Sequence, residues 1–449
     1  MKHKFIAIAV AFSLGCIAVS NAREVRSLSL EEAVSLSLQH SKELKISGSK
    51  VRYASAVAKE ARQRRLPDLK ASGSYLRVFQ PDIDLKVKTG NENNNSSNQG
   101  DAASSSFPEV NQAVYGMVNA SVPLFSGFRI QYGIRSARYL ERAAELDAEK
   151  DRQDIIQNTV EAYCNLYKSR SALELVKENL KQAEQRVKDF SNLEKNGVIA
   201  RNDLLKVQLQ SSDIELALLE AQNNYELSSI NMDLMLGLPE DVLLDPDSSS
   251  ISFNAEAGNF ETWQGIALHN RQDAAASHYR GMAASSAVKA ARGEYLPSLA
   301  LTGGYIAADI PGVLIITNAV NAGIGLSYSP SSLWKTGAKV AQAKAQLEQA
   351  EIGESLLGDA IRLQVAKAYQ DYISAVKKLD IYEKAVLQAD ENYRIVKNKY
   401  DNALENTTDL LDADVAQLRA RINQANGKAD AMVAYNRLLQ AAGTINTGQ

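Results

Sequence analysis

The chain of 449 residues carries 50 lysines and arginines against 53 aspartates and glutamates, a formal net charge of −3. This balance excludes the basic surface that a nucleic-acid partner requires. The four histidines and two cysteines show no metal-site spacing, and no phosphate loop, GxSxG elbow or Cys/His pairing occurs. We therefore expect no catalytic residue, no metal, no cofactor and no enzyme activity.

Residues 1–22 have the features of a secretory signal: two lysines, an apolar run over 5–19 and small residues over 20–22. The run is short for a spanning helix, so its length argues against the alternative of a membrane anchor. Lipidation at Cys16 stays open, because a glycine precedes this cysteine but the usual leucine three residues before it is absent. Removing the signal leaves 48 basic and 53 acidic residues and one cysteine, Cys164, so no intramolecular disulfide can form.

The sequence contains an internal repeat. Residues 59–75 and 289–305 align without gaps at an offset of 230 and share a Leu-Pro-x-Leu core. Further along the offset becomes 206, where Asp203-Leu204-Leu205 aligns with Asp409-Leu410-Leu411. The change means that the first copy contains 24 additional residues.

The additional residues fall around the polar run 89–106, which has nothing to bury and predicts a solvated loop. We interpret the chain as a tandem duplication, with repeat 1 over 23–245 and repeat 2 over 246–449. The boundary lies in a linker between Pro239 and Pro246.

Two long stretches predict helices, because all nine prolines lie outside 124–238 and 331–449. Apolar residues in both stretches recur at alternating steps of three and four, a heptad seam typical of coiled coils. We expect one helical hairpin per repeat, with an arm of about 60 residues, about 90 Å long, and tips near 195–205 and 400–411. The seam residues are Leu173, Val176, Leu180, Ala183, Val187 and Phe190 in the first stretch, Leu379, Tyr382, Val386, Ala389, Tyr393, Val396 and Tyr400 in the second, and Leu411, Val415, Leu418 and Ile422 after the second tip.

The segments that contain proline and glycine, about 69–125 and 298–329, predict two strands per repeat. Apolar and polar residues alternate in VYGMVNASVPLF (114–125) and AGIGLSYS (322–329). This pattern is typical of a half-buried strand in a soluble sheet, and equally of a membrane barrel with a lipid face and a lumen face. Four strands are too few to close a barrel, and open edges are not tolerated in lipid. A membrane location would therefore require several chains, and three chains would supply twelve strands.

With these features the chain resembles the TolC-like outer-membrane efflux proteins of Gram-negative bacteria, over essentially its whole mature length. The order and spacing of several short motifs carry the resemblance: LSLEEAVSLSLQHSKEL (28–44), VPLFSGFR (122–129), KNGVIARNDLLKVQ (195–208), LMLGLPED (234–241) and YDNALENTTDLLDA (400–413). The resemblance implies a mainly α-helical homotrimer, with a twelve-stranded barrel in outer-membrane lipid and an α-helical tunnel across the periplasm. It also implies a periplasmic membrane-fusion adaptor and an inner-membrane transporter as partners.

The resemblance assigns the pore constriction to two unpaired acids of the second tip. Asp409 and Asp412 share a helix face, and no lysine or arginine lies three or four residues from either. They match acidic rings that favour cations at the periplasmic entrance of such a tunnel. The alternative for Asp409 is a place in the first helical turn behind an N-cap at Asn406. In the first repeat Asp203 and Lys206 occupy the same positions and can pair with each other.

The resemblance also assigns a gate latch and an adaptor surface. Tyr400 and Asp203 match one latch, and Glu405 stands where a second latch has an arginine. Adaptor docking falls on Gly197, Val198, Ala403 and Leu404. Because Ala403 replaces a glycine and alanine tolerates positive φ poorly, we expect the second tip to turn differently.

The function that these features favour is a passive exit duct of a tripartite efflux pump or type I secretion system, gated at its periplasmic end. The alternatives are a periplasmic coiled-coil adaptor or scaffold that is not inserted in a membrane, and a surface stalk or adhesin. The sequence leaves open the cargo, the identity of the adaptor and pump, and whether the resting state is closed.

Overall fold

The computed structural model describes residues 25–77, 79, 112–251, 258–311, 314–402 and 404–445. The signal segment, Cys16, the polar run 89–106 and Ala403 lie outside the described residues. Within the described part, none of the helices is both long and apolar enough to cross a membrane.

The chain forms two compact units, and each takes residues from both halves of the sequence. We call Lys45–Lys150 with Gln272–Ala360 the sheet unit, and Met1–Leu44 with Asp151–Arg271 and Ile361–Gln449 the hairpin unit. Among the described residues, two long helices contribute substantially to both units, α3 (Arg129–Lys195) and α7 (Ser332–Asp401), and the first three residues of α2 (Lys42–Gln63) also belong to the hairpin unit.

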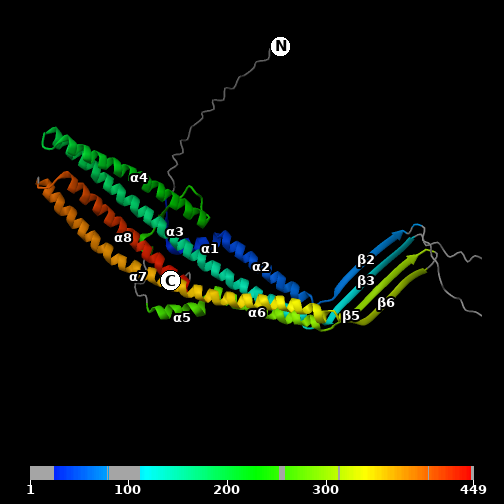
Figure 1. Ribbon diagram of the computed structural model, residues 1–449. Coiled ribbons are helices and arrows are strands. Elements are labelled where there is room, and N and C mark those ends of the chain that lie inside the picture. The colour runs from blue at the N-terminus through cyan, green and yellow to red at the C-terminus, as the bar shows by residue number, and fades with distance from the viewer. Residues whose placement is uncertain are drawn as a thin grey trace, which may run out of the picture. The chain divides into compact units, whose positions relative to one another are not determined.

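The sheet unit contains one antiparallel sheet in the order β2-β3-β5-β6 (Figure 1). Its strands are β2 (Asp68–Arg77), β3 (Gln112–Phe125), β5 (Ser298–Ile310) and β6 (Leu314–Ser327). The four predicted strands are confirmed, and β6 begins earlier than the alternating segment 322–329 predicted. The pairing of β3 with β5 joins the two strand hairpins, so β2 and β6 are the edges.

The register places apolar side chains of all four strands on one face of this sheet. Tyr75 lies opposite Val114, Val118 opposite Tyr305, and Leu301 opposite Ile324. The other face carries small and polar pairs such as Asn119 with Gly304 and Thr302 with Gly323. The predicted alternation holds over much of the sheet, but Met117 opposite Ile306 is an apolar pair on the second face.

Two further helices complete the sheet unit, α2 (Lys42–Gln63) and α6 (Gln272–Arg292), followed by the short 3₁₀ turn η2 (Gly293–Tyr295). In this unit α6 packs on α3 through Ala143, Leu146 and Ala276. The Ser136 hydroxyl also donates to the Ala283 carbonyl at 3.0 Å.

In the hairpin unit, α3 returns as α4 (Arg201–Leu236) and α7 returns as α8 (Thr407–Ala441) (Figure 1). The predicted seam is confirmed along α3, where Val176, Ala183 and Phe190 are buried. One position was wrong after the second tip, because the Val415 side chain is 46% exposed whereas Asp414 is 1% exposed. Asp414 can take the buried position because a cation on α3 neutralises it there.

The remaining elements of the hairpin unit are α1 (Leu30–His40), α5 (Phe260–Asn270), the 3₁₀ turn η1 (Ser248–Ser250), and a parallel pair formed by β1 (Val25–Leu28) and β4 (Leu243–Pro246). Strand β4 lies in the segment that the sequence predicts as a linker. Four residues are too few to show an alternating pattern, so periodicity could not predict this strand.

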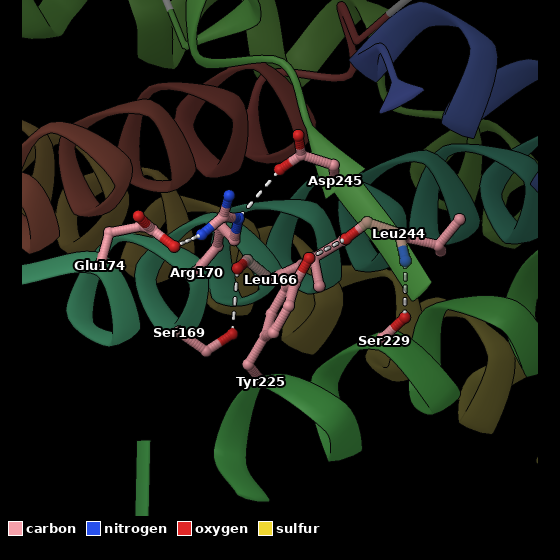
Figure 2. Close-up of polar contacts among 8 residues, drawn as sticks. All are labelled: Leu166, Ser169, Arg170, Glu174, Tyr225, Ser229, Leu244 and Asp245. Atoms are coloured by element: carbon pink, nitrogen blue, oxygen red, sulfur yellow. Dashed lines mark hydrogen bonds and ion pairs between the residues drawn. The ribbon is translucent and has the colours of Figure 1, made fainter. Parts of the chain in front are cut away.

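Side-chain hydrogen bonds hold β4 against α3 and α4 (Figure 2). The Tyr225 hydroxyl donates to the Leu244 carbonyl at 2.7 Å, and the Leu244 amide donates to the Ser229 hydroxyl at 2.9 Å. Arg170 on α3 pairs with Asp245 at 3.0 Å and also with Glu174. The short strand is thus fixed by both neighbouring helices as well as by β1.

Asp233 on α4 is an acid buried without compensation. Its side chain is fully buried, and neither carboxylate oxygen has a hydrogen-bond partner among the described residues. Burial, reinforced by the charges of Asp241 and Glu240 and opposed by Arg26, raises the pKa of Asp233 to about 6. The ionised form therefore destabilises the folded state.

We expect Asp233→Asn to raise the free energy of unfolding at pH 8 by up to about 3 kcal/mol, since one pKa unit corresponds to about 1.36 kcal/mol. The pKa of the folded state lies above the unfolded value, so protonation stabilises wild type below the unfolded pKa, and this stability is lost as the pH rises through 6. The advantage of the variant should therefore shrink between pH 8 and pH 4. Thermal unfolding followed by circular dichroism measures it, with the exposed Asp213→Asn as control. An advantage independent of pH would contradict the assignment.

Candidate functional site

The two hairpin tips meet in one apolar cluster within the hairpin unit. Its buried members are Phe190, Leu204, Val207, Leu410 and Leu411, from α3, α4 and α8. On α7, Tyr400 stacks on Phe190 with ring centroids 5.4 Å apart and an interplanar angle of 6°. The cluster brings the predicted constriction and latch residues into one region.

The first tip is a tight turn around Gly197, which has a φ of 70°. The Val198 amide donates to the Leu193 carbonyl at 2.9 Å across this turn, as in a Schellman motif. At the second tip the Leu404 amide donates to the Lys399 carbonyl at 2.8 Å, which is the same bond at an offset of 206. The expectation that the second tip turns differently is therefore wrong for this closing hydrogen bond, which joins residues on either side of Ala403.

The predicted docking residues of the tips are accessible where the structure describes them. Gly197 is exposed, Val198 is 66% exposed and Leu404 is 75% exposed. Ala403 lies outside the described residues. Each tip therefore presents one large apolar side chain to solvent at equivalent positions.

Asp409 lies in the first turn of α8, as the alternative interpretation of the sequence predicted. Asn406 is the N-cap: its Oδ1 accepts from the Asp409 amide at 3.0 Å, and its Nδ2 donates to the Asp409 carboxylate at 2.5 Å. The first bond caps the helix N-terminus, and the second joins the two side chains, so the carboxylate of Asp409 is held by the residue that caps its own amide. Asp412 is exposed, and Asp409 is half-buried.

The predicted pairing of Asp203 with Lys206 is confirmed, with their charged atoms 3.7 Å apart. The Lys206 ammonium also donates to the Thr408 hydroxyl at 3.3 Å, which joins the beginnings of α4 and α8. Glu405 pairs with Lys399 at 3.5 Å.

The structure places Tyr400 close to Asp203. Burial raises the pKa of the Tyr400 phenol, and the nearby charge of Asp203 raises it further. The Tyr400 side chain makes a hydrogen bond to Thr407 at the beginning of α8. Among the described residues the hydroxyl of Tyr400 is bound to Thr407 and not to Asp203, so the latch between Tyr400 and Asp203 stays a prediction.

A buried polar cluster beside the tips was missed in the sequence analysis. Asp414 on α8 accepts two hydrogen bonds from Arg186 on α3, at 3.1 and 3.2 Å, and one from Asn179 at 3.3 Å. Arg186 also donates to the Tyr393 hydroxyl of α7 at 3.3 Å. Burial lowers the pKa of Arg186, but the hydrogen bond and charge of Asp414 outweigh it, and the pKa is raised.

This cluster left a signal in the sequence. Asn179 and Arg186 are seven residues apart and alternate with Val176, Ala183 and Phe190 on the buried face of α3. A polar pair at heptad spacing inside an apolar seam indicates a buried partner. The partner lies 228 residues away from Arg186, so spacing alone could not identify it.

A four-stranded antiparallel sheet with an apolar face, joined in sequence to two long helical hairpins, is the architecture of an outer-membrane channel subunit. The chain belongs to the outer membrane efflux protein family, whose model matches residues 33–238 and 263–444. The resemblance to TolC-like proteins is thereby confirmed. Family membership places the protein in the outer membrane of a Gram-negative bacterium.

Individual relatives agree with this assignment. The outer membrane efflux protein BepC of Brucella suis is 23% identical over 328 residues, which cover 73% of this chain and 71% of BepC. The CmeC outer membrane channel of Campylobacter jejuni has the same fold, with a TM-score of 0.76 and 18% identity over 94% of this chain and 87% of CmeC. The MtrE outer membrane channel of Neisseria gonorrhoeae, solved in its open state, also has this fold, with a TM-score of 0.71. Its sequence is 17% identical, and the match covers 92% of this chain and 88% of MtrE.

We expect Asn406→Ala to destabilise the beginning of α8 by about 1 kcal/mol, because the Asp409 amide loses its acceptor. Hydrogen exchange in a peptide covering 404–411 should become faster, whereas exchange around Ala200, which caps α4 without a side-chain bond, should not change. Asn406→Asp keeps an acceptor and serves as the matched control. Equal exchange rates in wild type and Asn406→Ala would show that the cap contributes nothing.

Proposed function

We propose that the protein is the outer-membrane exit duct of a tripartite efflux pump or a type I secretion system, and that three copies form one channel. The observation that carries this proposal is the sheet, which has an apolar face and two edges, β2 and β6, that no other described strand pairs. In lipid, unpaired backbone groups cost several kcal/mol each. Copies of the sheet joined edge to edge satisfy these groups, and twelve strands make a closed barrel.

The edge strands have the side chains that such a barrel needs. Leu69 on β2 is 70% exposed, and Val320, Ile324 and Leu326 on β6 are 67–77% exposed. All four lie on the apolar face. Lipid would cover this face, and the face with small and polar residues would line the lumen.

The helices also present apolar surface that suits a second copy. We define the α4 stripe as Leu205, Leu209, Leu216, Leu227 and Leu234, each at least 50% exposed. At about 100° per residue these leucines fall within about 40° of one another, opposite the face of α4 that packs inside the chain. Leu363, Ile381 and Ile395 form a similar exposed line on α7. Burying one leucine side chain contributes about 2 kcal/mol, so pairing such stripes between copies would stabilise a trimer.

The tips would form the gated periplasmic entrance. In a trimer Asp409 and Asp412 would place six carboxylates around one pore, which favours cations. Tyr400 and Asp203 would hold the closed state, and opening would be a repacking of the second hairpins. The exposed Val198 and Leu404 and a groove of about 740 Å³ between α3 and α7 suit the helical hairpin of a periplasmic adaptor.

Energy for transport would come from an inner-membrane transporter, since the sequence contains no nucleotide-binding loop. The periplasmic scaffold alternative does not account for a sheet whose apolar face and edges are exposed.

We expect wild-type protein in detergent to have about three times the mass of one mature chain, and Leu209→Glu with Leu216→Glu to be monomeric, because two carboxylates in each stripe oppose its burial. Light scattering after size-exclusion chromatography measures the mass. Gln208→Glu with Gln222→Glu introduces the same charge on α4 outside the stripe and should stay trimeric. A monomeric wild type would refute the proposal.

We expect Asp409→Ala with Asp412→Ala to lower the cation preference of single channels in planar bilayers, because the six carboxylates at the constriction are removed. Reversal potentials in a salt gradient measure this preference. Glu215→Ala with Glu220→Ala, which removes two exposed acids from α4, is the control for lost charge. Unchanged selectivity in the Asp409 and Asp412 variant would reject the acidic ring.

A further inference from the structure

We propose that Asp414 is a positioning residue for the pore constriction: its contacts fix the rotation of α8 so that Asp409 and Asp412 face away from the packed hairpins. This inference rests on the proposed function, in which those two carboxylates line the pore. It adds a residue that does not itself face the pore and that no sequence motif assigned.

The positions of the three acids on α8 carry the first step. At about 100° per residue Asp412 lies about 160° from Asp414 in one direction, and Asp409 lies about 140° from it in the other. Asp414 is 1% exposed, whereas Asp412 is exposed. A helix that buries Asp414 against α3 must therefore direct the other two carboxylates to the opposite side.

The contacts of Asp414 are directional, so they can fix this rotation of α8. Its two oxygens take separate nitrogens of the Arg186 guanidinium, a two-point contact that fixes direction as well as distance. The amide of Asn179 adds a third hydrogen bond one heptad earlier on α3. Arg186 is in turn bound to the Tyr393 hydroxyl, so α3, α7 and α8 meet at this point.

The next turns of α8 repeat the arrangement toward α7. Gln417 donates to Asp390 at 2.8 Å, and Arg421 donates to the same carboxylate at 3.0 and 3.2 Å. Asp414, Gln417 and Arg421 follow a 3-4 spacing and so lie on one face of α8. We call these three residues the polar seam.

A polar seam determines rotation more sharply than an apolar one. Alanine and leucine can repack after a small turn of the helix, but a buried arginine has few positions in which a carboxylate neutralises it. Polar residues at seam positions fix register in coiled coils for the same reason. Turning Asp409 and Asp412 toward α3 would withdraw Asp414 and leave Arg186 buried without a counter-charge.

The test uses full-length trimers in planar bilayers and hexaamminecobalt(III), a trivalent cation, added on the periplasmic side. Asp414→Asn should weaken the block at least about tenfold, because α8 loses the contact that orients the ring. The charge swap Arg186→Asp with Asp414→Arg restores the pair and should bring the block back to within about threefold of wild type. Asp401→Asn removes an acid near the second tip that lies outside the polar seam. Channels of this variant should be blocked as strongly as wild-type channels.

A second measurement follows the orientation directly. A cysteine introduced as Asp412→Cys should react with a charged thiol reagent, and should react more slowly when Asp414→Asn is added. The native Cys164 contributes little background, because it is buried and burial raises its pKa to about 12. A purely structural contribution of Asp414 would lower the melting temperature of the trimer without changing this rate.

The outcomes separate this inference from the proposed function. If Asp409→Ala with Asp412→Ala is blocked as strongly as wild type, the acidic ring is wrong and the inference fails with it. If that variant loses the block while Asp414→Asn trimers keep it, the inference alone is wrong, as it is if an assembled charge-swap trimer stays unblocked. Should Asp414→Asn not assemble, Arg186→Lys decides, because it keeps the charge but loses the two-point contact: a weaker block supports the positioning role, and a wild-type block overturns it.

Discussion

Backbone hydrogen bonding at the two edges of a four-stranded sheet is the constraint on which the rest of this structure depends. Within the chain, β2 and β6 each pair on one side, and the face that joins them is apolar. Water could satisfy the free backbone groups but not the exposed leucines and valines, whereas lipid could cover the side chains but not the backbone. Sharing a barrel among copies resolves both requirements. In the proposed trimer, the same association would cover the apolar stripes that α4 and α7 carry on faces that do not pack within the chain.

The hairpin unit combines two kinds of contact with different physical roles. Apolar seams bring α3, α4 and α8 together. A small residue also lets α8 approach α7 closely, since a Cβ added at Gly427 would lie 2.6 Å from the Tyr382 ring. Polar contacts such as Arg186 with Asp414 contribute less to the stability of the folded chain, because removing two charges from water costs nearly as much free energy as their attraction returns. Their effect is to select one rotation of α8 from several that the apolar seam would accept.

The two tips share a turn but differ in charge. Equivalent backbone bonds close both turns, and each tip exposes one apolar side chain. The first tip neutralises its acid with Lys206, whereas the second leaves Asp412 exposed and holds Asp409 with Asn406. In the proposed channel the neutralised first tip would join the two hairpins, and the acidic second tip would form the constriction. The capped position of Asp409 is compatible with both roles, since a carboxylate in the first turn stabilises the helix N-terminus while one oxygen stays available to the pore.

The long helices, the four strands and the positions of the tips could be predicted from the amino-acid sequence. These follow from local rules: where proline is absent, where apolar residues recur every three or four positions, and where they alternate. The pairing of Asp203 with Lys206 and the capping of α8 by Asn406 could also be predicted, because both partners lie within one turn. Three features became visible only in the folded chain: β3 pairs with β5, Leu243–Pro246 is a strand, and Asp414 rather than Val415 faces inward. Each of these depends on a partner far away in the chain, and periodicity along one segment contains no information about what stands opposite it.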